Sequence, residues 1–272
     1  MRKSLVALSV LAASLSAATN AADYTDGNIH KNDYKWSQFN LMYAFDELPG
    51  ESSHDYLEME FGGRSGIFDL YGYVDVFDLT TDSDSDKAGA DKIFMKFAPR
   101  VSLDALTHSD LSFGPVQELY VATVMEWGGG KTGPGGFAAG VRGPNTQKIG
   151  LGSDVNVPWL GKIGLNLYGT YDSNQKDWNG YQISTNWFKP FYTLDNGSFV
   201  SYQGYIDYQF GMKEEYSSAS NGGAMFNGIY WHSERYAVGY GLKAYKDVYG
   251  IKDSDGFKST GISHYVSLTY KF

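Results

Sequence analysis

The segment Gly261–Phe272 (GISHYVSLTYKF) alternates between apolar and polar side chains. Every second residue from Val266 to Phe272 is apolar, and the residues between them are polar. Successive side chains of a β-strand point to opposite faces, so the segment predicts a strand with one apolar and one polar face. A strand of this kind that ends on an aromatic residue is typical of the closing strand of an outer-membrane barrel. The terminal strand of a soluble β-sandwich has the same alternation, so this segment alone leaves both folds open.

The N-terminal segment favours the barrel, because it has the features of a secretory signal peptide. Two basic residues precede a compact apolar run, and small residues follow up to Ala21 and Ala22 (MRKSLVALSVLAASLSAATNAA). The apolar run is too short to span a bilayer. We therefore expect residues 1–21 to be a cleaved signal peptide, with cleavage after Ala18 as the alternative. Residues 22–35 are polar and predict either a periplasmic lead or a plug, and residues 36–272 predict a single barrel domain.

Composition excludes several other classes of protein. The formal net charge is −9, which argues against a nucleic-acid partner. The chain contains no cysteine, so it has neither a disulfide framework nor a cysteine-ligated metal site. Aromatic residues make up 16% of the chain, and barrels concentrate such residues in girdles at the two membrane interfaces.

Alternating segments recur along the chain and predict an all-β transmembrane antiparallel barrel of about twelve strands. The candidate strands are Trp36–Phe45, Tyr56–Gly62, Ile67–Phe77, Lys92–Leu103, Ser112–Trp127, Gln147–Val155, Lys162–Tyr171, Gly180–Phe191, Ser198–Phe210, Met225–Ser233, Tyr236–Asp247 and Gly261–Phe272. Longer connections alternate with tighter ones, as in barrels with long extracellular loops and short periplasmic turns. The longer ones are Asp46–Asp55, Asp78–Asp91, Gly128–Asn145, Asp172–Asn179, Met212–Ala224 and Val248–Thr260.

If the apolar parity faces lipid, the opposite parity faces the lumen. That parity combines carboxylates, phenols, amides and basic groups. Aromatic rings can stack on a flat solute, and carboxylates and amides can bind its hydroxyl groups, so the lining favours small polar aromatic solutes. Opposite charges that pair across the lumen and close it would produce the same pattern, and the sequence leaves both interpretations open.

Several segments resemble the Tsx family of nucleoside-specific channel-forming outer-membrane proteins. These are Tyr56–Glu60 (YLEME), Asp69–Asp75 (DLYGYVD), Phe94–Met95 with Pro99–Arg100, Asp110–Pro115 (DLSFGP) and Trp178–Tyr181, where Asn179 replaces the Asp of a WDGY motif. The resemblance covers the mature chain, is strongest from Tyr56 to Tyr120, and is closest to the OmpK branch, whose members are known as bacteriophage receptors.

The resemblance implies a monomeric barrel with a narrow, keyhole-shaped pore and weak nucleoside sites. The positions that match the family's motifs, and that the parity argument also directs inward, are Glu58, Glu60, Asp69, Tyr71, Tyr73, Asp75, Arg100 and Glu118. The expected partners are outer-membrane lipid and lipopolysaccharide, nucleosides, and bacteriophage at the outer loops. We therefore expect a channel for nucleosides or similar solutes whose loops can serve as a phage receptor. The alternative is a largely closed barrel that acts mainly as a surface receptor.

An enzyme is not expected. Some outer-membrane barrels use a Ser–His pair on the barrel wall, but the adjacent residues His232 and Ser233 would face opposite sides of a strand. The aspartates of Asp78–Asp91 do not have the spacing of a calcium loop, so no metal site is expected. No cofactor is expected either.

Overall fold

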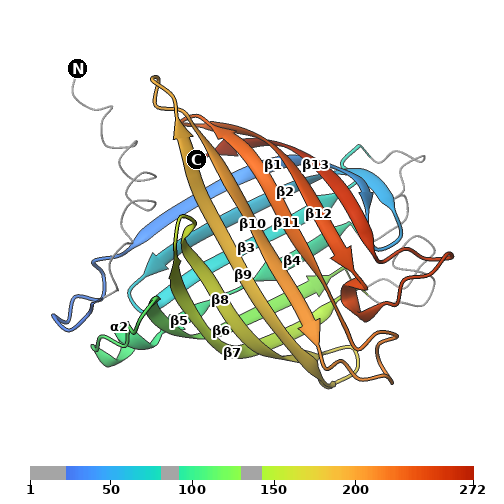
Figure 1. The fold of residues 1–272 in the computed structure, drawn as a ribbon, viewed down its shortest axis with the longest axis horizontal. Helices are drawn as coiled ribbons and strands as arrows, with labels where there is room; N and C mark the ends of the chain where they lie inside the picture. The colour runs from blue at the N-terminus through green and yellow to red at the C-terminus, as the bar shows by residue number, and fades with distance from the viewer. Residues whose placement is uncertain (1–22, 81–91, 130–142) are drawn as a thin grey trace.

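The structure is a computed structural model that describes residues 23–80, 92–129 and 143–272. These residues form a closed antiparallel barrel (Figure 1). The strands are β1 (Tyr34–Glu47), β2 (Ser52–Ser65), β3 (Phe68–Phe77), β4 (Ile93–Phe97), β5 (Arg100–Ser102), β6 (Val116–Gly128), β7 (Asn145–Val157), β8 (Gly161–Asp172), β9 (Asp177–Thr193), β10 (Phe199–Phe210), β11 (Asn221–His232), β12 (Tyr236–Lys246) and β13 (Gly261–Lys271). The expected signal peptide and most of the expected loops Asp78–Asp91 and Gly128–Asn145 lie outside the described residues.

β4 and β5 together occupy one position in the barrel. Both pair with β3 on one side and with β6 on the other. Pro99 lies between them, and proline has no N–H to donate to a strand ladder. The barrel therefore has twelve strand positions, which confirms the predicted fold class.

The barrel closes where β1 pairs with β13, and the C-terminal segment is the closing strand that its alternation predicted. Leu41 lies opposite Leu268, and Tyr43 lies opposite Val266. Directly opposed residues of an antiparallel pair lie on the same face, so their apolar side chains form one continuous outer surface. Because β1 also pairs with β2 and β13 also pairs with β12, the ring of strands has no free edge here.

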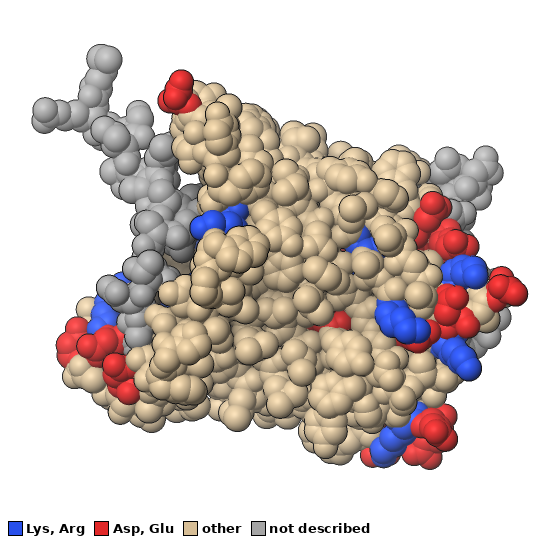
Figure 2. Space-filling view, in the orientation of Figure 1, with Lys and Arg blue, Asp and Glu red and all other residues tan. Residues whose placement is uncertain are grey.

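The outer wall is apolar and the inner wall is polar. Leu268 is 51% exposed on the outside, whereas its neighbours Ser267 and Thr269 are buried inside. Charged side chains gather at the two ends of the barrel, and the band between them is mostly uncharged on the visible face (Figure 2). This arrangement fits an aqueous phase at each end and hydrocarbon around the middle.

The two ends of the barrel differ. The end that carries the C-terminus has short connections, such as those between β11 and β12, and we call it the turn end. The opposite end, the loop end, carries the β10–β11 and β12–β13 connections, the latter with the short helix η1 (Val248–Gly250) (Figure 1). Two of the connections expected to be long contain only residues 48–51 and 173–176, because the strands beside them extend further than their alternation indicated.

The sequence did not predict the short helix α2 (Leu103–Thr107) at the turn end. The Ser102 hydroxyl caps it by accepting the backbone N–H of Ala105. The buried carboxylate of Asp104 accepts the backbone N–H groups of Leu111 and Leu119, and its burial raises its pKa. These bonds attach the connection between β5 and β6 to the barrel. Among the described residues, no helix has the length and apolar character to cross a membrane.

The position of β13 in the lipid-facing wall can be tested with two arginine substitutions on the same strand face. We expect Val266→Arg, near the middle of the wall, to lower the free energy of unfolding by about 2–4 kcal/mol. Ile262→Arg, close to the loop end, should cost about 0–1 kcal/mol, because the penalty for a charge falls toward the interface. Denaturant unfolding of the barrel in lipid vesicles measures both, and equal losses would contradict this placement.

Candidate functional site

A wall of carboxylates and tyrosines lines the lumen on β2 and β3. Glu58 and Glu60 point inward from β2, and Tyr71, Tyr73 and Asp75 point inward from β3. In the register of the two strands, Glu58 lies opposite Asp75 and Glu60 lies opposite Tyr73. The Tyr71 hydroxyl donates a hydrogen bond of 2.7 Å to Glu60. We call these five residues the acidic–tyrosine wall.

Neutral groups hold the two glutamates of this wall. Gln38 donates to Glu60 at 2.6 Å, and Asn40 donates to Glu58 at 2.6 Å and to Glu60 at 3.1 Å. Within the described part of the chain, no lysine or arginine forms an ion pair with either glutamate. A carboxylate has about four acceptor sites, and these bonds together with that from Tyr71 use one site of Glu58 and three of Glu60. Both glutamates can therefore accept a further hydrogen bond from a hydroxyl group of a solute.

Ion pairs nearer the turn end contain the other three predicted site residues, Asp69, Arg100 and Glu118. Arg100 contacts Asp69 at 3.2 Å and Asp154 at 3.0 Å, and its guanidinium lies 3.9 Å from the centre of the Tyr120 ring. The structure therefore places Asp69 and Arg100 among charges that neutralise one another. In this part of the lumen, opposite charges pair, which is the alternative to a binding surface that the sequence left open.

Glu118 forms a bidentate pair with Arg64, an inward-facing residue that the sequence analysis missed. The two bonds are 2.6 and 2.9 Å long, and both side chains are buried. Ser102 donates to the same carboxylate, and Tyr24 is fully buried, with its ring 5.2 Å from the guanidinium. Arg64 was missed because the candidate strand ended at Gly62, although Arg64 has the same parity as Glu58 and Glu60.

Three aromatic side chains form a second surface in the lumen, which we call the aromatic shelf: Tyr205 on β10, and Phe226 and Tyr230 on β11. The Tyr205 and Phe226 rings stack with centroids 5.9 Å apart and an interplanar angle of 15°. The glycines of β12 leave room for the rings of the aromatic shelf to pack against this strand. A Cβ atom on Gly241 would lie 2.2 Å from the Phe226 ring, and one on Gly239 would lie 2.1 Å from the Tyr230 ring.

The loop end of the lumen has its own cluster around Glu47. Tyr265 donates to this carboxylate at 2.9 Å, and the hydroxyls of Tyr245 and Tyr265 are 2.7 Å apart. His54 lies 3.2 Å and Lys243 lies 3.8 Å from the same glutamate. The mouth of the barrel at this end therefore combines phenols with a carboxylate and two basic side chains.

Hydroxyl groups and aromatic rings contact the side chains of His232 and His264. His232 contacts the Ser201 hydroxyl at 2.9 Å, across the β10–β11 pair, and the Phe199 ring stacks on it. His264 lies on the outer face and contacts the Tyr240 hydroxyl. Among the described residues, no group of three or more His, Cys, Asp or Glu side chains is arranged to hold a metal ion.

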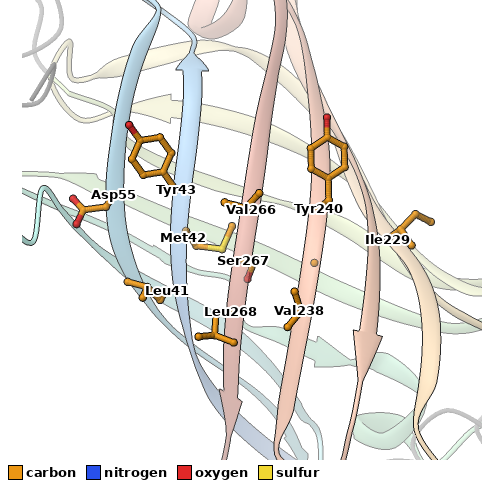
Figure 3. Close-up of a pocket in the computed structure, with 11 residues that line it drawn as sticks. Leu41, Met42, Tyr43, Asp55, Ile229, Val238, Tyr240, Val266, Ser267 and Leu268 are labelled. Carbon is orange, nitrogen blue, oxygen red and sulfur yellow. The ribbon is translucent and has the colours of Figure 1, made fainter.

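A hollow on the outside of the barrel lies across β1, β13 and β12. Tyr43 and Leu41 border it on one side and Tyr240 and Val238 on the other, with Val266 between them (Figure 3). These side chains belong to the lipid-facing parity. The hollow is therefore part of the membrane-facing wall and is unsuited to a polar solute.

Comparison with known proteins identifies the family. Residues 31–272 match the family described as "Nucleoside-specific channel-forming protein, Tsx". The chain belongs to this family.

Two groups of relatives illustrate the breadth of the Tsx family. The chain is 77% identical, over the full length of both chains, to "Outer membrane protein OmpK" of Vibrio parahaemolyticus serotype O3:K6. It is 30% identical to "Nucleoside-specific channel-forming protein Tsx" of Escherichia coli O157:H7, over 82% of this chain and 77% of that one. A solved NanC porin shares the fold at a TM-score of 0.50, with 3% identity over 86% of this chain and 98% of the porin.

Family membership confirms three expectations from the sequence. The protein is an outer-membrane protein, it is a Tsx-family channel, and it is not an enzyme. The resemblance to the Tsx family and its OmpK branch is likewise confirmed.

The contact between Gly241 and the aromatic shelf can be tested by adding a methyl group at this glycine and measuring the conductance of the pore. Gly241→Ala adds a methyl group where the Phe226 ring lies, so the ring must move toward the lumen. We expect the single-channel conductance to fall by roughly a third. The double variant Gly241→Ala/Phe226→Ala removes the displaced ring and should recover at least the original conductance. A similar loss in both variants would show that the methyl group acts by some route other than Phe226.

Proposed function

We propose that the channel conducts nucleosides or closely similar small polar aromatic solutes. The observation that carries this proposal is the position of the acidic–tyrosine wall opposite the aromatic shelf. β3 and β10 occupy opposite positions in the ring of strands. Tyr73 on β3 lies opposite Lys96 on β4, and the Lys96 ammonium contacts Asp207, two residues beyond Tyr205 on β10, at 3.1 Å. A solute in the lumen therefore passes between rings on both sides.

The chemistry of the two surfaces suits a nucleoside. A base is flat and can stack on Tyr71, Tyr73 or Tyr205, and stacking of this kind contributes about 1–3 kcal/mol per base. The ribose hydroxyls can donate to Glu58 and Glu60, because the hydrogen bonds that hold these carboxylates do not use all of their acceptor sites. Binding of this strength is weak enough for release, which a conducting site requires. The family description and the names of the Escherichia coli and Salmonella relatives support the same solute class.

Block of ion current by adenosine tests this proposal. Protein reconstituted in a planar bilayer should show a small conductance that adenosine reduces in a concentration-dependent way. Tyr71→Ala removes one stacking surface and should raise the half-blocking concentration by about ten-fold. Tyr208→Ala, on the lipid-facing side of β10, is the matched control and should leave the block unchanged. A conductance indifferent to every nucleoside tested would refute the proposal and favour the largely closed barrel.

We also propose that the loop end serves as a bacteriophage receptor. The 247–260 connection supports this role because it presents a surface with a defined shape. The backbone N–H groups of Ser259 and Thr260 donate to Asp253 and lower the pKa of that carboxyl. Asp253 in turn donates its own N–H to Asp247, which ties the connection to the end of β12. An ordered surface loop offers a phage protein a fixed set of contacts with little entropic cost.

Loop variants test the receptor role separately from conduction. Deletions confined to the connections between β3 and β4 or between β6 and β7, and the substitution Asp253→Ala, leave the strands of the barrel intact. We expect at least one of them to reduce phage adsorption to whole cells by about ten-fold or more, with the conductance of the purified barrel unchanged. Normal adsorption of every phage by all of these variants would contradict the receptor role.

A further inference from the structure

One ion pair in the lumen joins strands from nearly opposite positions in the barrel. Lys96 on β4 contacts Asp207 on β10 at 3.1 Å. In the ring of strands, β6, β7, β8 and β9 separate them on one side, and β3, β2, β1, β13, β12 and β11 separate them on the other. The two residues therefore come from nearly opposite walls, and their side chains meet inside the barrel.

Contacts at each end brace this ion pair. Glu126 on β6 lies 3.7 Å from the Lys96 ammonium and also contacts Lys148 on β7. On the other wall, Ser184 donates to Asp207 at 2.5 Å and Gln182 donates to it at 3.2 Å. Both ends therefore have a partner on an adjacent strand, which restricts the rotamers of the lysine and the aspartate.

The two sides of this ion pair differ in packing. On the β6–β9 side, Val124, Lys148, Tyr168 and Gln182 point inward and are at most 3% exposed. On the other side, the acidic–tyrosine wall and the aromatic shelf contain half-buried side chains, including Glu58, Tyr73 and Tyr205. The ion pair thus lies at the border between a packed part of the interior and a lining that solvent reaches.

We propose that Lys96 and Asp207 form a crossbar that divides the lumen and confines permeation to the side lined by the acidic–tyrosine wall and the aromatic shelf. A salt bridge requires contact between its partners, so the two walls lie within the combined reach of one lysine and one aspartate side chain. The crossbar therefore sets one edge of the pore and limits the size of the solutes that pass. This inference rests on the channel activity of the family and not on the identity of the solute.

Conductance in plain salt solution provides the first test. Lys96→Ala and Asp207→Ala each remove one half of the crossbar, and we expect each to raise the single-channel conductance at least about 1.5-fold. Lys162→Ala is the control, because Lys162 on β8 pairs with Asp154 on the adjacent strand β7, so this ion pair does not span the lumen. Its conductance should stay at the original value. No nucleoside is present, so the outcome is independent of the proposed solute. Equal conductance in all four proteins would overturn the crossbar.

Cross-linking provides the second test and does not depend on how well the alanine variants fold. The chain contains no cysteine, so Lys96→Cys/Asp207→Cys introduces the only two thiols. A short bis-methanethiosulfonate reagent should join them within one chain, lower the conductance of the open variant, and release that block when a reductant is added. The single variant Lys96→Cys should show no reductant-sensitive link within the chain. Failure of the double variant to cross-link in the folded barrel would place the residues apart and refute the proposal.

Discussion

The whole structure depends on the satisfaction of backbone hydrogen bonds in a medium without water. In hydrocarbon, an unpaired N–H or C=O group costs several kcal/mol, so a spanning sheet is stable only when it closes on itself. The pairing of β1 with β13 meets this requirement, because it removes the last free edge of the sheet. The register of that pairing also aligns Leu41 with Leu268 on the outside and Asn40 with Thr269 inside. One set of backbone bonds thus fixes both the closure of the barrel and the faces of its strands.

Closure creates a second problem, because the polar parity of every strand is enclosed in a narrow interior. The protein solves it in three ways. Neutral amides and a phenol hold the carboxylates Glu58 and Glu60. Arg64 neutralises Glu118 through two short hydrogen bonds. Charges from distant strands meet in the lumen in the Lys96–Asp207 pair. Among the described residues, only the first arrangement holds carboxylates with neutral donors, whereas the other two pair each carboxylate with a basic group.

Much of the fold could be predicted because strand parity is a local property. The apolar residues of β13 face outward as their alternation indicated, and all eight candidate residues point inward. The sequence did not separate these eight into a wall held by neutral donors and a set of ion pairs, because pairing depends on which strands closure brings together. Arg64 lay beyond an expected strand boundary, and the contact of His232 with Ser201 joins two strands, so a search for an adjacent serine could not reveal it.

The sequence by itself determined the class of fold, the face of each strand and the family, since alternation and motifs are read along the chain. Only the tertiary structure decided which inward side chains touch. Lys96 and Asp207 are 111 positions apart, and nothing along the chain relates them. Their contact exists because closure places β4 and β10 on nearly opposite walls of a narrow barrel. The shape of the lumen is therefore a property of the closed ring of strands, whereas the chemical character of its lining is a property of the sequence.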